Sequence, residues 1–189
     1  MKRNELVRIA IASVIAAGSL SGCSTYHSIV NYIQADNASV CPDAAILAST
    51  SSLPAFDPTK GIDPSNLIYS VAMTNVKTRC DFDKKTNRAD ANLEVFFQAT
   101  RPPGGDEASY RVPYFVAVTT SGEIKDKQMH WLELGFDRGA TTAVAQDDVE
   151  SIEIKAEKTT RIYEYHLVVG FQLTKSQIDY NAKMGQYEP

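Results

Sequence analysis

The sequence is short of the residues on which most catalytic and metal sites depend. It contains three histidines, three cysteines and one tryptophan among 189 residues. No HExxH zinc motif, GxSxG nucleophile elbow or Walker loop occurs along the chain. The three histidines are too far apart in sequence to form a metal motif: His27, His130 and His166. The sequence therefore predicts no enzyme, no metal site and no cofactor.

Clusters of basic residues are also absent. The chain has 19 lysines and arginines against 23 acidic residues, for a net charge of −4. Proteins that bind nucleic acid need a basic surface, so nucleic acid is not an expected partner. The acidic pairs Asp106-Glu107 and Asp147-Asp148 could hold calcium or act as paired carboxylates. Solvated loop charge is the more ordinary explanation for both pairs.

The apolar run at residues 9–17 is shorter than the roughly 20 residues that a membrane span requires. It contains one polar residue, Ser13, and follows three basic residues: Lys2, Arg3 and Arg8. A basic region followed by a short apolar region is the organisation of a secretory signal peptide. We therefore expect residues 1–22 to be a cleaved leader.

The leader ends at Leu20-Ser21-Gly22-Cys23, which resembles the lipobox of bacterial lipoproteins. The resemblance implies cleavage before Cys23, a diacylglycerol thioether on its thiol and an acyl chain such as palmitate on its amine. Two or three chains hold a protein firmly to a membrane, whereas one chain does not. The alternative is an ordinary cysteine beside a standard cleavage site. Ser24 follows the lipidated cysteine. By resemblance to the sorting rule of enterobacterial lipoproteins, the absence of Asp at this position favours the outer membrane, with the protein facing the periplasm.

Removing residues 1–22 from the 189 leaves 167, enough for one domain with a sizeable core. We expect residues 23–40 to be a lipidated tether and residues 41–189 to be a single domain. Lipidation of Cys23 leaves Cys41 and Cys80, which are expected to pair because the cell envelope is oxidising. Metal binding by this pair is the alternative, but their spacing is unlike that of a zinc site.

Apolar and polar residues alternate with a period of two over most of the chain after residue 67, which predicts β-strands. The expected strands cover residues 67–80, 91–100, 112–120, 125–136, 149–155 and 163–173, with a short edge strand at 45–48. Residues 140–148 are small and polar and are expected to form a loop. Thr174 is expected to cap a short helix that runs to Lys183.

Strands joined by Gly, Pro and Asp turns without a helical period predict an all-β fold, an antiparallel β-sandwich with a short C-terminal helix. An immunoglobulin-like arrangement is the first choice and a small barrel the second. The chain also resembles uncharacterised envelope lipoproteins of alphaproteobacteria. The resemblance lies in the lipobox, Cys41-Pro42, Cys80 and the segments 45–47, 113–118 and 169–173. It implies a lipid-anchored β-sandwich and brings no catalytic residues.

Four aromatic residues are candidates for an exposed docking patch: Phe96, Phe115, His130 and Trp131. Phe96 and Phe115 fall on the strand faces opposite the expected core, and Trp131 is the only tryptophan. Packing is the more common role of aromatic strand residues, so the patch is a hypothesis. The leading functional hypothesis is a non-enzymatic interaction or accessory module of an envelope complex. A domain that binds a glycan or lipid is the second, and a hydrolase with a dispersed site the third.

Overall fold

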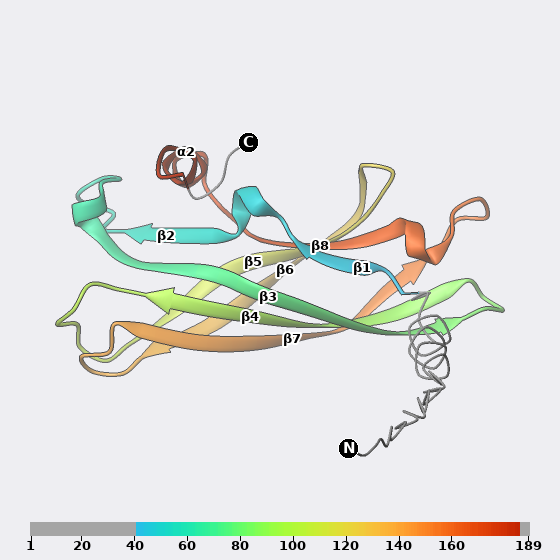
Figure 1. Ribbon diagram of the computed structural model, residues 1–189, viewed down its shortest axis with the longest axis horizontal. Helices are drawn as coiled ribbons and strands as arrows, with labels where there is room; N and C mark the ends of the chain where they lie inside the picture. Colours follow the sequence, from blue (N-terminus) through green and yellow to red (C-terminus); the bar gives the residue numbers. More distant parts are fainter. Residues whose placement is uncertain (1–40, 186–189) are drawn as a thin grey trace, which may run out of the picture. The chain divides into compact units, whose positions relative to one another are not determined.

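The computed structural model describes residues 41–185, which form two packed four-stranded β-sheets (Figure 1). Sheet A has the strand order β1-β8-β5-β6 and sheet B the order β2-β3-β4-β7. The predicted antiparallel β-sandwich with a C-terminal helix is confirmed, and the sheets do not close into a barrel. The strands are β1 (Asp43–Ile46), β2 (Ser52–Phe56), β3 (Leu67–Asp83), β4 (Arg88–Thr100), β5 (Ala108–Thr120), β6 (Glu123–Phe136), β7 (Thr142–Lys155) and β8 (Tyr165–Phe171). Three 3₁₀ helices, η1 (Ala48–Thr50), η2 (Pro64–Asn66) and η3 (Ile162–Glu164), and the helix α2 (Lys175–Lys183) complete the described elements.

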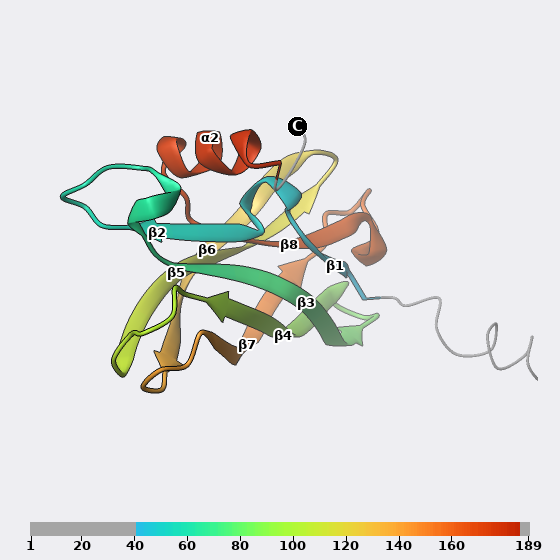
Figure 2. The same ribbon diagram turned by 60° about the vertical axis from the view of Figure 1, so that its left-hand side comes forward.

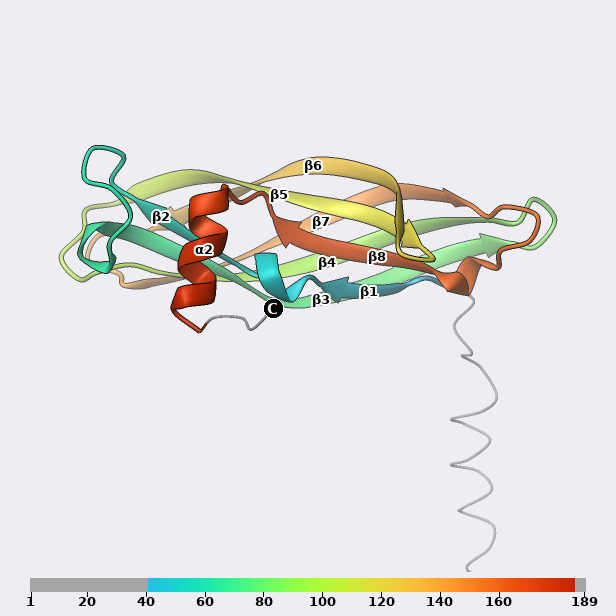
Figure 3. The same ribbon diagram turned by 90° about the horizontal axis from the view of Figure 1, so that it is seen from above.

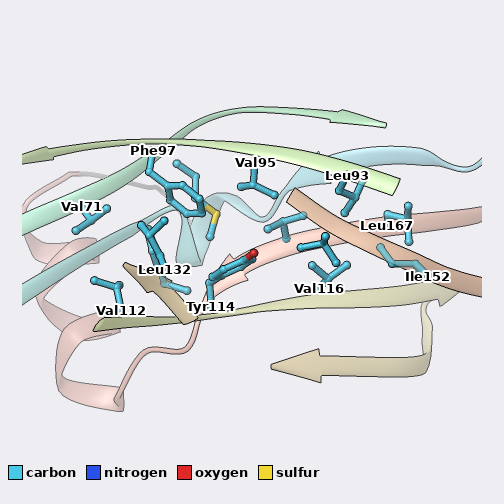
Figure 4. Packing of buried hydrophobic residues seen from close by; sticks show 14 of the residues in the cluster. Val71, Leu93, Val95, Phe97, Val112, Tyr114, Val116, Leu132, Ile152 and Leu167 are labelled. Carbon is cyan, nitrogen blue, oxygen red and sulfur yellow. The ribbon is translucent and has the colours of Figure 1, made fainter. Parts of the chain in front are cut away.

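The core lies between the two sheets and follows from the alternation in the strands (Figure 4). Alternate residues of β4 from Ala89 to Ala99 are buried, and so are the inward residues of β5 and β8. Phe97 of sheet B contacts two rings of sheet A, Tyr114 at 5.4 Å and Phe171 at 5.9 Å between ring centres. Burying a large apolar side chain stabilises a fold by about 1.5–3 kcal/mol, so these contacts hold the layers together.

Two long hairpins contribute two neighbouring strands to each sheet. β3 pairs with β4 in sheet B, and β5 pairs with β6 in sheet A. At the β5–β6 turn, Ser121 and Gly122 have φ angles of 52° and 79°. Two adjacent left-handed residues match the right-handed twist of a tight hairpin, so Ser121 and Gly122 form the turn.

The expected loop at residues 140–148 is wrong, because β7 begins at Thr142 and pairs with β4 along that stretch. The inward residues there are Ala143, Ala145 and Asp147. Ala143 and Ala145 are small, and the Asp147 carboxylate accepts a hydrogen bond from the buried Tyr114 hydroxyl. The alternation is present, but it carries no large apolar side chains that would mark it in the sequence.

The part of the domain before residue 67 contains two short edge strands, where the sequence predicted one. β1 covers residues 43–46, not 45–48, and pairs with β8 in the parallel sense. β2 pairs with β3 and contains Pro54. Proline lacks an N–H donor and is tolerated at an edge, where one side of the backbone needs no partner. The chain crosses from sheet A to sheet B between these strands, through η1 (Figure 1).

Helix α2 begins as predicted at Thr174, whose side chain and Gln177 form a reciprocal capping box. Gln177 Nε2 donates to Pro54 O and Asn181 Nδ2 donates to Ser52 O, each at 2.7 Å. Tyr180 packs edge-on against Phe56, with 4.9 Å between ring centres. The helix therefore covers β2 and one end of the sandwich (Figure 2).

A disulfide joins Cys41 to Cys80, whose Cα atoms lie 5.7 Å apart. Cys41 stands just before β1 of sheet A, and Cys80 lies within β3 of sheet B. The disulfide therefore links the start of the domain, next to β1 of sheet A, to β3 of sheet B. A cross-link that closes a loop of 39 residues stabilises a fold by about 4 kcal/mol in the chain-entropy model.

Replacing both cysteines, Cys41→Ser with Cys80→Ser, is expected to lower the free energy of unfolding by about 2–5 kcal/mol. The physical reason is the larger conformational entropy of the unfolded chain once the link is gone. Urea denaturation of the variant and of the oxidised protein measures the difference. Equal midpoints and slopes for the two proteins would show that the disulfide adds no stability.

Candidate docking surface

The outer faces of the two sheets differ in chemistry. Outward side chains of sheet B are mostly charged or polar, among them Lys77, Arg79, Asp81, Asp90, Asn92, Glu94, Gln98, Gln146 and Asp148. Outward side chains of sheet A are mixed: the polar or charged ones are Ser109, Arg111, Thr119, Lys127, Glu133 and His166, and the apolar ones include Pro113, Phe115, Ala117, Met129, Trp131, Val168 and Gly170. Antiparallel sheets that face water carry polar residues on that side, so the exposed Met129 and Trp131 beside Phe115 depart from the ordinary pattern.

The pairing register places the unusual residues of sheet A side by side. Met129 of β6 lies opposite Phe115 of β5, and Phe115 lies opposite Gly170 of β8. In the next outward row, Trp131 lies opposite Pro113. We call six outward residues of β5 and β6 the β5–β6 face. They are Arg111, Pro113, Phe115, Lys127, Met129 and Trp131.

Phe115 forms the base of the β5–β6 face and is only 8% exposed. Its ring lies against Gly170, where a Cβ would come within 2.9 Å of the Phe115 Cζ and would also clash with Thr50. Glycine therefore allows the ring to lie flat on β8. The Lys127 ammonium stands 4.2 Å from the ring centre on the solvent side. Phe115 supports the surface from below, and its neighbours make the contact with solvent.

Trp131 and Met129 are the exposed apolar side chains of this face, at 52% and 46% of their surface. The Arg111 guanidinium lies 5.1 Å from the Trp131 ring, and its Nε is 2.8 Å from Glu133 Oε1. These contacts hold the tryptophan in one orientation. Seen from above, α2 lies across β2, and no other described element is drawn over β6 (Figure 3). The 3₁₀ helix η1 packs against β8, where Thr50 lies beside Gly170.

The four candidate docking residues do not converge as expected. Phe115 and Trp131 share the outer face of sheet A, but Phe96 lies on the outer face of sheet B under Lys77, 4.9 Å away. His130 belongs to β6, yet its ring points inward and stacks on Tyr114 at 5.3 Å. Alternation within a strand assigns a face correctly, but it does not say which sheet the strand joins.

His130 instead belongs to a polar cluster between the sheets that the sequence did not reveal. The hydroxyl of Tyr114, whose side chain is fully buried, donates to Asp147 Oδ2 at 2.7 Å. Burial, and then the Asp147 contact, raise the pKa of Tyr114, so the hydroxyl stays protonated and keeps donating. Among residues 41–185, the buried Nε2 of His130 has no hydrogen-bond partner. Burial lowers the pKa of His130, and the nearby Asp147 carboxylate partly opposes that shift.

The remaining predicted residues are placed as follows. His166 is exposed on the outer face of sheet A, and the acids 106–107 lie in the exposed β4–β5 loop. Cys23, His27 and the signal and tether segments lie outside the described residues. Across residues 41–185 no group of three His, Cys, Asp or Glu side chains could hold a metal ion. A groove of about 520 Å³ lies between α2 and residues 62–64, lined in part by Ile62, Pro64, Tyr180 and Met184.

The stability of the domain is expected to fall as the pH drops below about 6.5, because His130 is buried in its neutral form. A folded-state pKa below the unfolded value gives stability that is complete above the unfolded pKa and is lost as the pH falls. His130→Phe keeps a ring against Tyr114 and removes the titration. Melting temperatures at about pH 7.5 and pH 5 should therefore differ less for the variant than for the parent. An equal drop in both proteins would rule out this role of His130.

No protein-family model matches the chain, and neither a curated protein nor a solved structure matches it. Within the part of the chain that the structure describes, no helix has the length and apolar character to cross a membrane. The function is therefore inferred from the surface itself, where Arg111 lies beside the exposed Trp131 ring and Lys127 lies over the buried Phe115 ring.

Proposed function

We propose that this chain is a non-enzymatic interaction module, an accessory component of an envelope protein complex, which docks through the β5–β6 face. The observation that carries the proposal is the aromatic and apolar cluster on the outer face of sheet A, where the exposed Trp131 and Met129 lie opposite Pro113 and Phe115. Exposed apolar patches on soluble domains mark interaction surfaces, because water otherwise covers them at a cost in free energy.

The residue types of the face support the same proposal. Trp, Met, Phe and Arg are enriched in the centres of protein interfaces, and Trp and Arg dominate binding energies there. Trp131 is held by Arg111, and Phe115 is packed on Gly170 before any partner arrives. A surface that is already ordered loses little conformational entropy on binding, which favours affinity.

Anchoring completes the proposed function. Lipidation of Cys23 would hold the domain at the outer membrane, facing the periplasm, with residues 24–40 as the connection. Restricting both partners to one membrane raises their effective concentration, so that a modest surface suffices for stable docking. The support for this part of the proposal is the lipobox resemblance at Leu20-Ser21-Gly22-Cys23.

A second candidate function is the binding of a small glycan or lipid in the groove beside α2. Its volume of about 520 Å³ lies in the range of ligand sites, and Tyr180, Ile62 and Met184 give it apolar walls. Trp131, the single tryptophan of the sequence, does not line this groove and lies on the β5–β6 face. If the groove binds a ligand, Tyr180→Ala should weaken binding of that ligand and leave docking through the β5–β6 face unchanged, which separates the two functions.

Trp131→Ala is expected to reduce recovery of the partner at least about tenfold after cross-linking in intact cells and affinity capture. Trp131 is half exposed, so its removal should leave the fold and the melting temperature nearly unchanged. The matched control is Val144→Ala, which trims an 82% exposed apolar residue on the outer face of sheet B. Equal recovery with both variants would contradict docking through the β5–β6 face.

A further inference from the structure

Lys127 occupies the last outward row of the β5–β6 face, opposite Ala117, and its side chain reaches back over Phe115. Its Nζ lies 4.2 Å from the Phe115 ring centre and donates to Gln172 Oε1 at 3.1 Å. None of the ion pairs formed among residues 41–185 includes Lys127. The neutral amide and the ring leave its positive charge without a carboxylate partner, in contrast to the neighbouring cations.

Those neighbours are already neutralised. Arg111 is paired with Glu133, and Lys125 contacts Glu123 and Glu157. The face therefore presents one unpaired cation among apolar side chains. Docking would remove water from this ammonium, and a desolvated charge without a counter-ion strongly opposes binding. A partner that covers the face must consequently bring an anionic group to this point.

We propose that the partner is a protein segment that places an Asp or Glu carboxylate on Lys127 and apolar side chains on Met129 and Trp131. The inference rests on the docking function proposed above and adds the chemistry of the partner. A single unpaired cation suits a single carboxylate. An anionic bilayer or a nucleic acid would be matched by several free cations on one face, which this surface does not offer.

The chain contains a matched control for this arrangement. Lys77 lies 4.9 Å from the ring of Phe96 on the outer face of sheet B, so it is a lysine over a phenylalanine in the same kind of strand. Its surroundings are polar and rich in acids, including Glu94 and Asp148. Charge reversal at Lys77 should therefore leave docking unchanged, whereas charge reversal at Lys127 should abolish it.

The first step of the test finds the partner with the full chain in intact cells. A photo-cross-linking residue replaces Met129 on the β5–β6 face or, as a control, Val144 on sheet B. Mass spectrometry identifies the adducts, and the attachment site on the partner locates its contacting segment. The expected result is one protein adduct at position 129, next to an Asp or Glu of the partner, and no such adduct at position 144.

The second step measures the affinity of the purified pair. Lys127→Glu should weaken binding at least about tenfold, Lys127→Met should weaken it less, and Lys77→Glu should have no effect. Changing the partner's contacting carboxylate to lysine should restore binding to Lys127→Glu. Lys127 is exposed, so its substitutions should leave the fold intact. Circular dichroism and the melting temperature of each variant check this.

The outcomes separate the two proposals. Undiminished affinity with Lys127→Glu, or no rescue by the partner's lysine, would overturn the carboxylate contact while docking stands. A lipid adduct at position 129 would replace the protein partner with a membrane surface. Absence of any adduct at position 129 would overturn docking through this face, and the carboxylate contact with it.

Discussion

The packing of the two inner sheet faces around Tyr114, Phe97 and Phe171 is the constraint on which the rest of the structure depends. Side chains of a strand alternate between its two faces, so fixing Tyr114 in the core fixes its neighbour Phe115 on the outside. A shift of one residue in β5 would exchange the two. The apolar character of the outer face is therefore a direct consequence of the same register that builds the core.

The edge of sheet B at β7 is protected against the addition of another strand. The edge strand β7 carries Asp147 toward the interior, where Tyr114 holds it. Farther along β7, Ser151 has a φ of 60° within a bulge, and its N–H is bonded to Asn92 Oδ1 at 3.0 Å. Inward charges and bulges hinder the addition of another strand at an edge. The β5–β6 face carries an apolar surface and neither of these devices.

The fold class, the disulfide partners and the cap at Thr174 could be predicted because each depends on local spacing or on a small inventory of residue types. The first half of β7 could not, since Ala143, Ala145 and Asp147 replace the large apolar residues that make alternation visible. Of the four candidate docking residues, Phe115 and Trp131 share a face, as alternation predicts. The separation of Phe96 depends on which strands pair, and His130 faces inward because it alternates with Trp131 and is in phase with the buried Leu132. The anchoring at Cys23 and the resemblance to envelope lipoproteins stay predictions.

The most direct test of the account uses the unmodified protein and two methionines of nearly equal exposure, Met129 at 46% and Met184 at 49%. Met129 lies on the β5–β6 face, and Met184 lies beyond α2 beside the groove. Brief oxidation and mass spectrometry would compare sulfoxide formation at both positions in purified protein and in intact cells. Docking through this face predicts that Met129 becomes protected in cells while Met184 does not. Equal oxidation of the two residues in both settings would contradict it.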